Sequence, residues 1–115
     1  MRLDARKEPA MERQKEMIGG YFKRLARARQ IGEPVVYTFV PGNLAELLGA
    51  FGTAPVLPEI NALQSGMRKK SAEYIARAEK AGHSEDVCTY VKCDIGMSLA
   101  GNVGPTGDVI PDPDL

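Results

Sequence analysis

The sequence predicts an α/β protein in which a partial Rossmann-like parallel sheet is flanked by helices. Residues 35–40, VVYTFV, have the β-branched and aromatic content of a buried strand, and residues 54–57 form a second short apolar run between prolines. One helical pattern separates these runs and a longer one follows, an order typical of parallel sheets. Two strands cannot bury both faces of such a sheet. We therefore expect an N-terminal fragment of a larger subunit.

The N-terminal region predicts one amphipathic helix. Residues 1–8 are charged and are expected to be frayed, whereas Pro9 suits the first position of a helix. Apolar side chains then recur every seven residues, at Met11, Ile18 and Leu25. We expect this helix to extend to about Gln30 and to pack against the core through that stripe.

A second, shorter helix is expected over residues 44–51. Pro41 and Gly42 end the first strand, and Asn43 with Glu46 makes a start that resembles a capping box. A turn of this kind is where α/β proteins bind anions and ligands, but every strand-to-helix unit has one, so both interpretations stay open. Asn43 is expected to cap the helix rather than to contact a substrate.

A long helix is expected after the second strand and should end at Gly82. Asn61 and Gln64 could cap its start, and the basic residues 68–70 are expected to be solvated helix surface. The apolar residues at helical spacing are Leu63, Met67, Tyr74, Ile75 and Ala78. Residues 101–115 are rich in Gly, Pro and Asp and predict a loop that leads into a missing C-terminal part. Residues 9–100 would then form the incomplete α/β domain.

Composition excludes several classes of protein. Fifteen Lys and Arg balance fifteen Asp and Glu, which argues against a nucleic-acid binder that relies on phosphate neutralisation. No apolar run approaches the roughly 20 residues that span a bilayer. The N-terminus lacks the apolar core of a signal peptide. Two cysteines in such a chain suggest reduced thiols and a cytoplasmic protein.

The chemically versatile residues are concentrated in residues 82–97, GHSEDVCTYVKCDIGM, which hold the single His and both Cys. Ser84 and the two acidic residues after it predict a helix start, with Cys88 in the first turn. Backbone N–H groups and the helix dipole favour an anionic sulfur there, although the neighbouring carboxylates oppose this. A free cysteine is also commonly a small buried apolar residue. Cys93 lies about 140° around the helix from Cys88, so the two do not easily share one metal ion.

Three segments resemble the benzoyl-CoA reductase and 2-hydroxyacyl-CoA dehydratase family, most strongly the B-type catalytic subunits of ATP-dependent benzoyl-CoA reductases. They are PGNLAELL at residues 41–48, LPEINALQSGMRKKS at residues 57–71 and the stretch from residue 82 to 97. The resemblance runs from about residue 15 to residue 115. It implies that Cys88 is a ligand of a [4Fe-4S] cluster that residues outside this chain complete. The family usually has a non-ligand residue at the place of Cys93, so no such role is implied for it.

The resemblance also implies an activity. In the family, a separate ATP-hydrolysing iron–sulfur activator supplies a low-potential electron, and the catalytic subunit passes it to an aromatic acyl-CoA thioester in anaerobic aromatic degradation. The implied partners are the other reductase subunits, including that activator, and the acyl-CoA substrate. The chain alone is expected to be inactive. Two alternatives stay open: a 2-hydroxyacyl-CoA dehydratase component, and a truncated, non-catalytic module for subunit docking.

Three further side chains are candidates for assisting this chemistry. Glu59 follows the second strand, at the rim where α/β sheets place ligands, and could transfer a proton; alternatively it is a helix-entry carboxylate stabilised by the dipole. His83 could donate a proton, although an isolated His after a helix end is commonly exposed and idle. Lys92 lies four residues after Cys88 on the same predicted helical face, where its charge could stabilise the sulfur or a reduced cluster. The alternative for Lys92 is a surface lysine.

Overall fold

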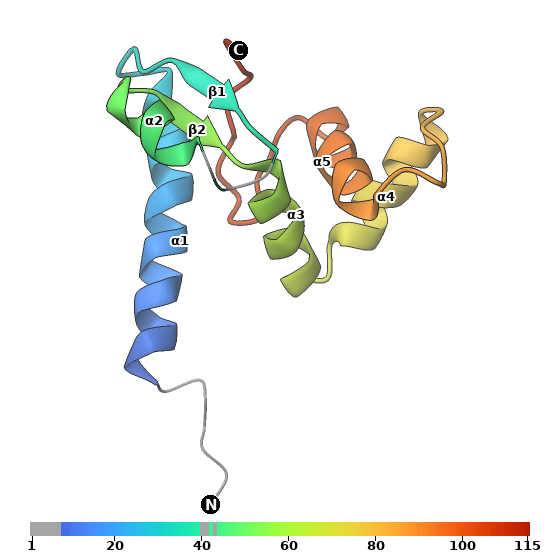
Figure 1. The fold of residues 1–115 in the computed structure, drawn as a ribbon. Helices are drawn as coiled ribbons and strands as arrows, with labels where there is room; N and C mark the ends of the chain where they lie inside the picture. Colours follow the sequence, from blue (N-terminus) through green and yellow to red (C-terminus); the bar gives the residue numbers. More distant parts are fainter. Residues whose placement is uncertain (1–7, 40–41, 43) are drawn as a thin grey trace, which may run out of the picture.

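The computed structural model describes residues 8–39, 42 and 44–115, which form seven elements around a two-stranded sheet. In chain order they are α1 (Pro9–Ala28), β1 (Val35–Tyr37), α2 (Ala45–Ala50), β2 (Ala54–Val56), α3 (Pro58–Met67), α4 (Ser71–Lys80) and α5 (Thr89–Leu99). Figure 1 shows α1 as a long helix standing apart from the group α3–α5, with the strands joining them at one end. Asn43, the expected cap of α2, lies outside the described residues.

The two strands pair in parallel, as the sequence predicts. Val35 lies opposite Ala54, and Tyr37 lies opposite Val56. β1 is shorter than the expected run to residue 40, because hydrogen bonding changes partners after Tyr37. The Thr38 N–H still bonds to the Val56 carbonyl at 3.0 Å, but the Phe39 carbonyl accepts the N–H of Glu59 in α3 at 3.2 Å. The predicted α/β fold, with parallel strands flanked by helices, is confirmed.

The core lies between the sheet and one face of each longer helix. Its buried members are Phe22, Leu25, Ala28, Val35, Ala54, Val56, Ala62, Tyr74, Cys93, Met97 and Ile110. The stripe predicted on α1 is confirmed for Leu25, and Ile18 is partly buried against the core. Met11, at the start of the helix, is instead 36% exposed. The core therefore contacts mainly the C-terminal half of α1.

The long helix expected to end at Gly82 is in fact two helices, so that prediction is wrong. α3 begins at Pro58, which places Asn61 and Gln64 inside the helix and not at its cap. Lys69 adopts the left-handed conformation, with φ 59°, and ends α3. The Lys70 N–H bonds to the Ser65 carbonyl and the Lys69 N–H to that of Gly66, which is the Schellman pattern of a helix end. Residues 68–70 are therefore a junction.

Gly82 ends α4 as predicted. Its φ is 100°, and the Gly82 and His83 N–H groups close the same kind of cap on the carbonyls of Glu79 and Ala78. The loop that follows, residues 81–88, leads into α5.

The last residues of the chain run beside the free edge of β1. The Leu115 N–H bonds to the Val35 carbonyl at 3.3 Å, and the Leu115 carbonyl accepts the Tyr37 N–H at 2.9 Å. These groups of β1 point away from β2, because Pro34 and Thr38 make the bonds to that strand. The segment after residue 100 thus contributes hydrogen bonds to the sheet as well as the buried Ile110 to the core.

Candidate functional site

Cys88 occupies the N-cap of α5. The helix begins at Thr89, so the prediction of a start at Ser84 with Cys88 in the first turn is wrong. The Ser84 hydroxyl accepts the Asp86 N–H at 3.2 Å and closes a turn, a structure that Ser supports as readily as a helix cap. Cys88 is exposed, and its backbone is extended, with φ −45° and ψ 131°. Its thiol is accessible at the positive end of the helix dipole.

Lys92 is buried against the loop that carries Cys88, so the alternative of a surface lysine is wrong. Its ammonium donates to a Glu79 carboxylate oxygen at 2.6 Å and to the Glu85 carbonyl at 2.7 Å. Its side chain is 4% exposed, against 32% for Glu79. The Lys92 N–H also bonds to the Cys88 carbonyl at 3.0 Å. Lys92 therefore ties α5 and the loop before it to α4.

Cys93 faces the core, away from the accessible Cys88. It is 2% exposed, and burial raises the pKa of its thiol, partly offset by a hydrogen bond with Ser65. Within the described part of the chain, no three side chains from His, Cys, Asp and Glu gather as a metal site.

Glu59 and His83 lie on different elements. Glu59 is in the first turn of α3, directly after β2, and is partly buried. His83 is exposed in the α4–α5 loop, which also carries Cys88. The location of Glu59 is compatible with both interpretations of this residue, because the end of β2 is also the start of α3.

A polar cluster missed by sequence reasoning lies inside the molecule around Asp94. Burial raises the pKa of Asp94, and a hydrogen bond from Asn61 partly offsets this. Asn61 is 1% exposed, and its Oδ1 has no hydrogen-bond partner among the described residues. The sequence carries no clear signal of this cluster, because Asn61 resembles a helix cap there and its burial appears only in the structure, where buried amides are normally satisfied.

Two tyrosines extend the cluster toward the carboxyl ends of the strands. The Tyr21 hydroxyl donates to the Pro55 carbonyl at 3.2 Å and accepts the Leu57 N–H at 2.9 Å, while that of Tyr37 donates to the Pro111 carbonyl at 2.9 Å. Burial, with a smaller effect of the Asp94 charge, raises the pKa of both tyrosines to about 12. Their hydroxyls therefore stay protonated at neutral pH.

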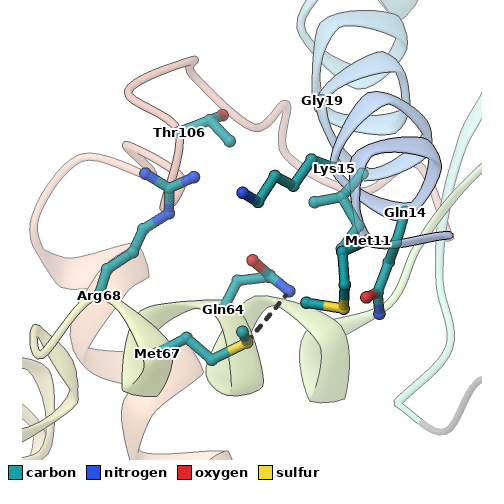
Figure 2. A pocket seen from close by; sticks show the side chains of 9 residues that line it. Met11, Gln14, Lys15, Gly19, Gln64, Met67, Arg68 and Thr106 are labelled. Carbon is teal, nitrogen blue, oxygen red and sulfur yellow. Dashed lines mark hydrogen bonds between the residues drawn. The ribbon is translucent and has the colours of Figure 1, made fainter. Parts of the chain in front are cut away.

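Two hollows flank the C-terminal end of α3. The first, of about 130 Å³, lies between α1 and α3. Figure 2 shows Lys15 and Arg68 reaching into it from opposite sides above Gln64. The second, of about 180 Å³, lies between α3, α4 and the first turn of α5, and its lining includes Thr89, the residue after Cys88. Met67 lines both hollows.

Comparison with known proteins gives an extensive match. The sequence is 58% identical over 109 residues to the B-type subunit of the benzoyl-CoA reductase of Thauera aromatica. The chain is thus similar to a benzoyl-CoA reductase subunit of the B type. The match covers 95% of the chain and confirms the resemblance expected from the sequence. The chain spans about a quarter of the length of that relative, because the match covers 25% of it.

No family model matches the sequence. Among the described helices, none is long and apolar enough to cross a membrane.

Proposed function

We propose that this chain is part of the catalytic iron–sulfur subunit of an ATP-dependent benzoyl-CoA reductase and that Cys88 is a ligand of its [4Fe-4S] cluster. The supporting observation is the 58% identity to the B-type benzoyl-CoA reductase subunit over nearly the whole chain. When bound, such a cluster would supply the low-potential electron that reduces an aromatic acyl-CoA.

The residues around Cys88 fit a shared cluster. The thiol is exposed, as a ligand facing a cluster held jointly with other segments must be, and the α5 N-terminus favours negative charge beside it. Among the described residues, no three His, Cys, Asp or Glu side chains gather closely enough to hold a metal ion without outside ligands. The other ligands would come from the rest of the subunit.

The roles of the chain's own residues follow from their positions. Lys92 holds the Cys88 loop on α4 through Glu79, and we propose that this pair fixes the position of the sulfur and lowers the cost of added negative charge nearby. Glu59 and His83 are proposed proton donors or acceptors, the first at the carboxyl end of β2 and the second in the Cys88 loop. The partners would be the other reductase subunits and an ATP-hydrolysing activator, in the cytoplasm.

The test replaces each cysteine in the intact, co-expressed complex. We expect Cys88→Ser to lower the iron content and to abolish reduction of benzoyl-CoA, whereas Cys93→Ser, the matched control in the core, should keep its iron. Normal iron content and activity in Cys88→Ser would contradict the proposed ligand.

The products and partners of the same complex separate the alternatives. A reductase yields a dearomatised product from benzoyl-CoA, whereas a dehydratase component yields an enoyl-CoA from a 2-hydroxyacyl-CoA. The docking alternative is considered because the described residues do not by themselves gather three potential metal ligands. A docking module would co-purify with a partner subunit, and Cys88→Ser would leave the iron of that assembly unchanged.

A further inference from the structure

The hollow between α1 and α3 combines positive charge with an apolar lining. Lys15 and Arg68 come from different elements, and neither forms an ion pair within residues 8–39, 42 and 44–115. Met11 and Ile18 line the apolar part, and the buried Gln64 lies beneath the two cations. Two cations above an apolar surface favour the binding of an anionic group attached to an apolar organic group.

The hollow on the other side of α3 is mainly apolar. Leu63 and Ile75 line it together with Cys93, and the hydroxyl-bearing Thr89 and Tyr90 lie where it meets α5. Its volume of about 180 Å³ slightly exceeds the roughly 150 Å³ known to hold one benzene ring. Thr89 and Tyr90 directly follow Cys88 in the chain, so the lining of this hollow begins one residue after the proposed cluster ligand.

The boundary between the hollows is adaptable. Met67 lines both hollows and Gly66 lines the second, and Met67 is 67% exposed with a flexible, unbranched side chain. Nothing lies within 4 Å of the position that a Cβ of Gly66 would take. An extended ligand could therefore pass from one hollow to the other over the end of α3.

We propose that an acyl-CoA lies across the end of α3, with its phosphates at Lys15 and Arg68 and its apolar acyl group in the hollow beside Tyr90. The proposal rests on the proposed function and adds the location of the substrate. Its basis is the match in charge and shape: a CoA thioester has an anionic nucleotide at one end, an apolar acyl group at the other and a flexible arm between them. The phosphate end takes the cationic hollow and the acyl end takes the hollow lined by Thr89 and Tyr90.

The first test removes the two cations in the intact reductase complex. We expect Lys15→Gln with Arg68→Gln to weaken binding of free CoA by about tenfold or more, and to raise the KM for benzoyl-CoA, because each cation contributes a charge-assisted hydrogen bond. Added salt should weaken CoA binding less in this variant than in the parent protein. The matched control is Lys23→Gln with Arg27→Gln, which also removes two positive charges but at positions of α1 that do not line this hollow.

The second test fills the acyl hollow. Leu63 is 43% exposed, so Leu63→Trp should fold. We expect it to raise the KM for benzoyl-CoA while leaving the affinity for free CoA unchanged. Unchanged CoA affinity in the Lys15→Gln/Arg68→Gln variant would overturn the proposal. So would a loss of subunit assembly with CoA affinity retained, because another part of the reductase would then occupy the cationic hollow.

The outcome is separable from that of the proposed function. If CoA binding depends on Lys15 and Arg68 but Cys88→Ser keeps full iron and activity, the binding site stands and the cluster ligand is wrong. If Cys88→Ser loses its iron but CoA binding does not depend on Lys15 and Arg68, the cluster ligand stands and the proposed binding site is wrong.

Discussion

The ammonium of Lys92 lies 2.6 Å from a carboxylate oxygen of Glu79, and this contact joins α5 to α4 where Lys92 is almost completely buried. The two partners are unequally exposed, since Glu79 keeps 32% of its side chain accessible against 4% for Lys92. The cost of breaking the pair should therefore depend on which partner is removed.

We expect Glu79→Gln to be more destabilising than Lys92→Met. The first leaves a buried ammonium without its counter-charge and should lower the free energy of unfolding by about 2–4 kcal/mol. The second leaves a carboxylate that can regain water and should cost less. Urea denaturation measures both, with Arg77→Met as the surface control, because its pair with Glu73 is exposed and should contribute less than about 1 kcal/mol. A larger loss of unfolding free energy in Lys92→Met than in Glu79→Gln would contradict this expectation.

Gly96 is expected to tolerate no side chain. A Cβ at this position would overlap the backbone carbonyl of Tyr74, where α5 packs on α4. Gly96→Ala should therefore lower the free energy of unfolding by about 3 kcal/mol or more, because neither backbone can move aside locally. Gly20→Ala in α1 meets open space and should instead stabilise the protein by about 0.5–1 kcal/mol. Thermal or urea unfolding of the two variants checks this contrast in sign.

Stability should fall in alkaline solution because of Tyr21 and Tyr37. Burial raises their pKa from 10.0 to about 12, so the unfolded chain loses these protons first. Their contribution is fully present below pH 10.0 and is lost as the pH rises to about 12. Unfolding measured against pH should show this decline, and Tyr21→Phe should make it shallower. If the stability of Tyr21→Phe fell equally steeply with pH, the alkaline loss of stability would come from other groups.

Asp94 is expected to destabilise the protein at neutral pH. Burial raises its pKa above the ordinary value of 3.8 in the folded state, so its favourable contribution is present below that value and is lost as the pH rises through the folded pKa. Asp94→Asn should therefore raise the free energy of unfolding at neutral pH and have little effect in acid. If Asp94→Asn instead lowered the free energy of unfolding at neutral pH, the hydrogen bond from Asn61 would outweigh the cost of burying the Asp94 charge. A carboxylate kept at such a cost is commonly functional.

The sequence predicts those parts of the fold that rest on local signals. The helix from Pro9, the parallel strands and the stop at Gly82 each follow from side-chain spacing, β-branched content or a left-handed glycine. The break between α3 and α4 was missed because Lys69, not a glycine, takes the left-handed position. The apolar spacing continues through the break because both helices contact α5.

The site was harder to predict because it depends on contacts between distant residues. The burial of Lys92 requires Glu79 on another helix, and the cluster around Asp94 requires Asn61, which resembles a cap in the sequence. The start of α5 was misplaced because Ser84 closes a turn with the same hydroxyl chemistry that caps a helix. The boundary expected at residue 100 and the cluster role of Cys88 stay predictions.

The close packing of Gly96 on Tyr74 also bears on the order of folding. α4 and α5 are joined by the short loop 81–88, whereas the contact of Leu115 with β1 closes a loop of most of the chain. Local contacts form at a smaller entropic cost, so we expect the α4–α5 hairpin in the transition state and the sheet edge after it. Gly96→Ala should then slow refolding, whereas Val35→Ala should mainly speed unfolding, as stopped-flow kinetics would reveal. The loop that carries Cys88 would take its shape before the strands have paired.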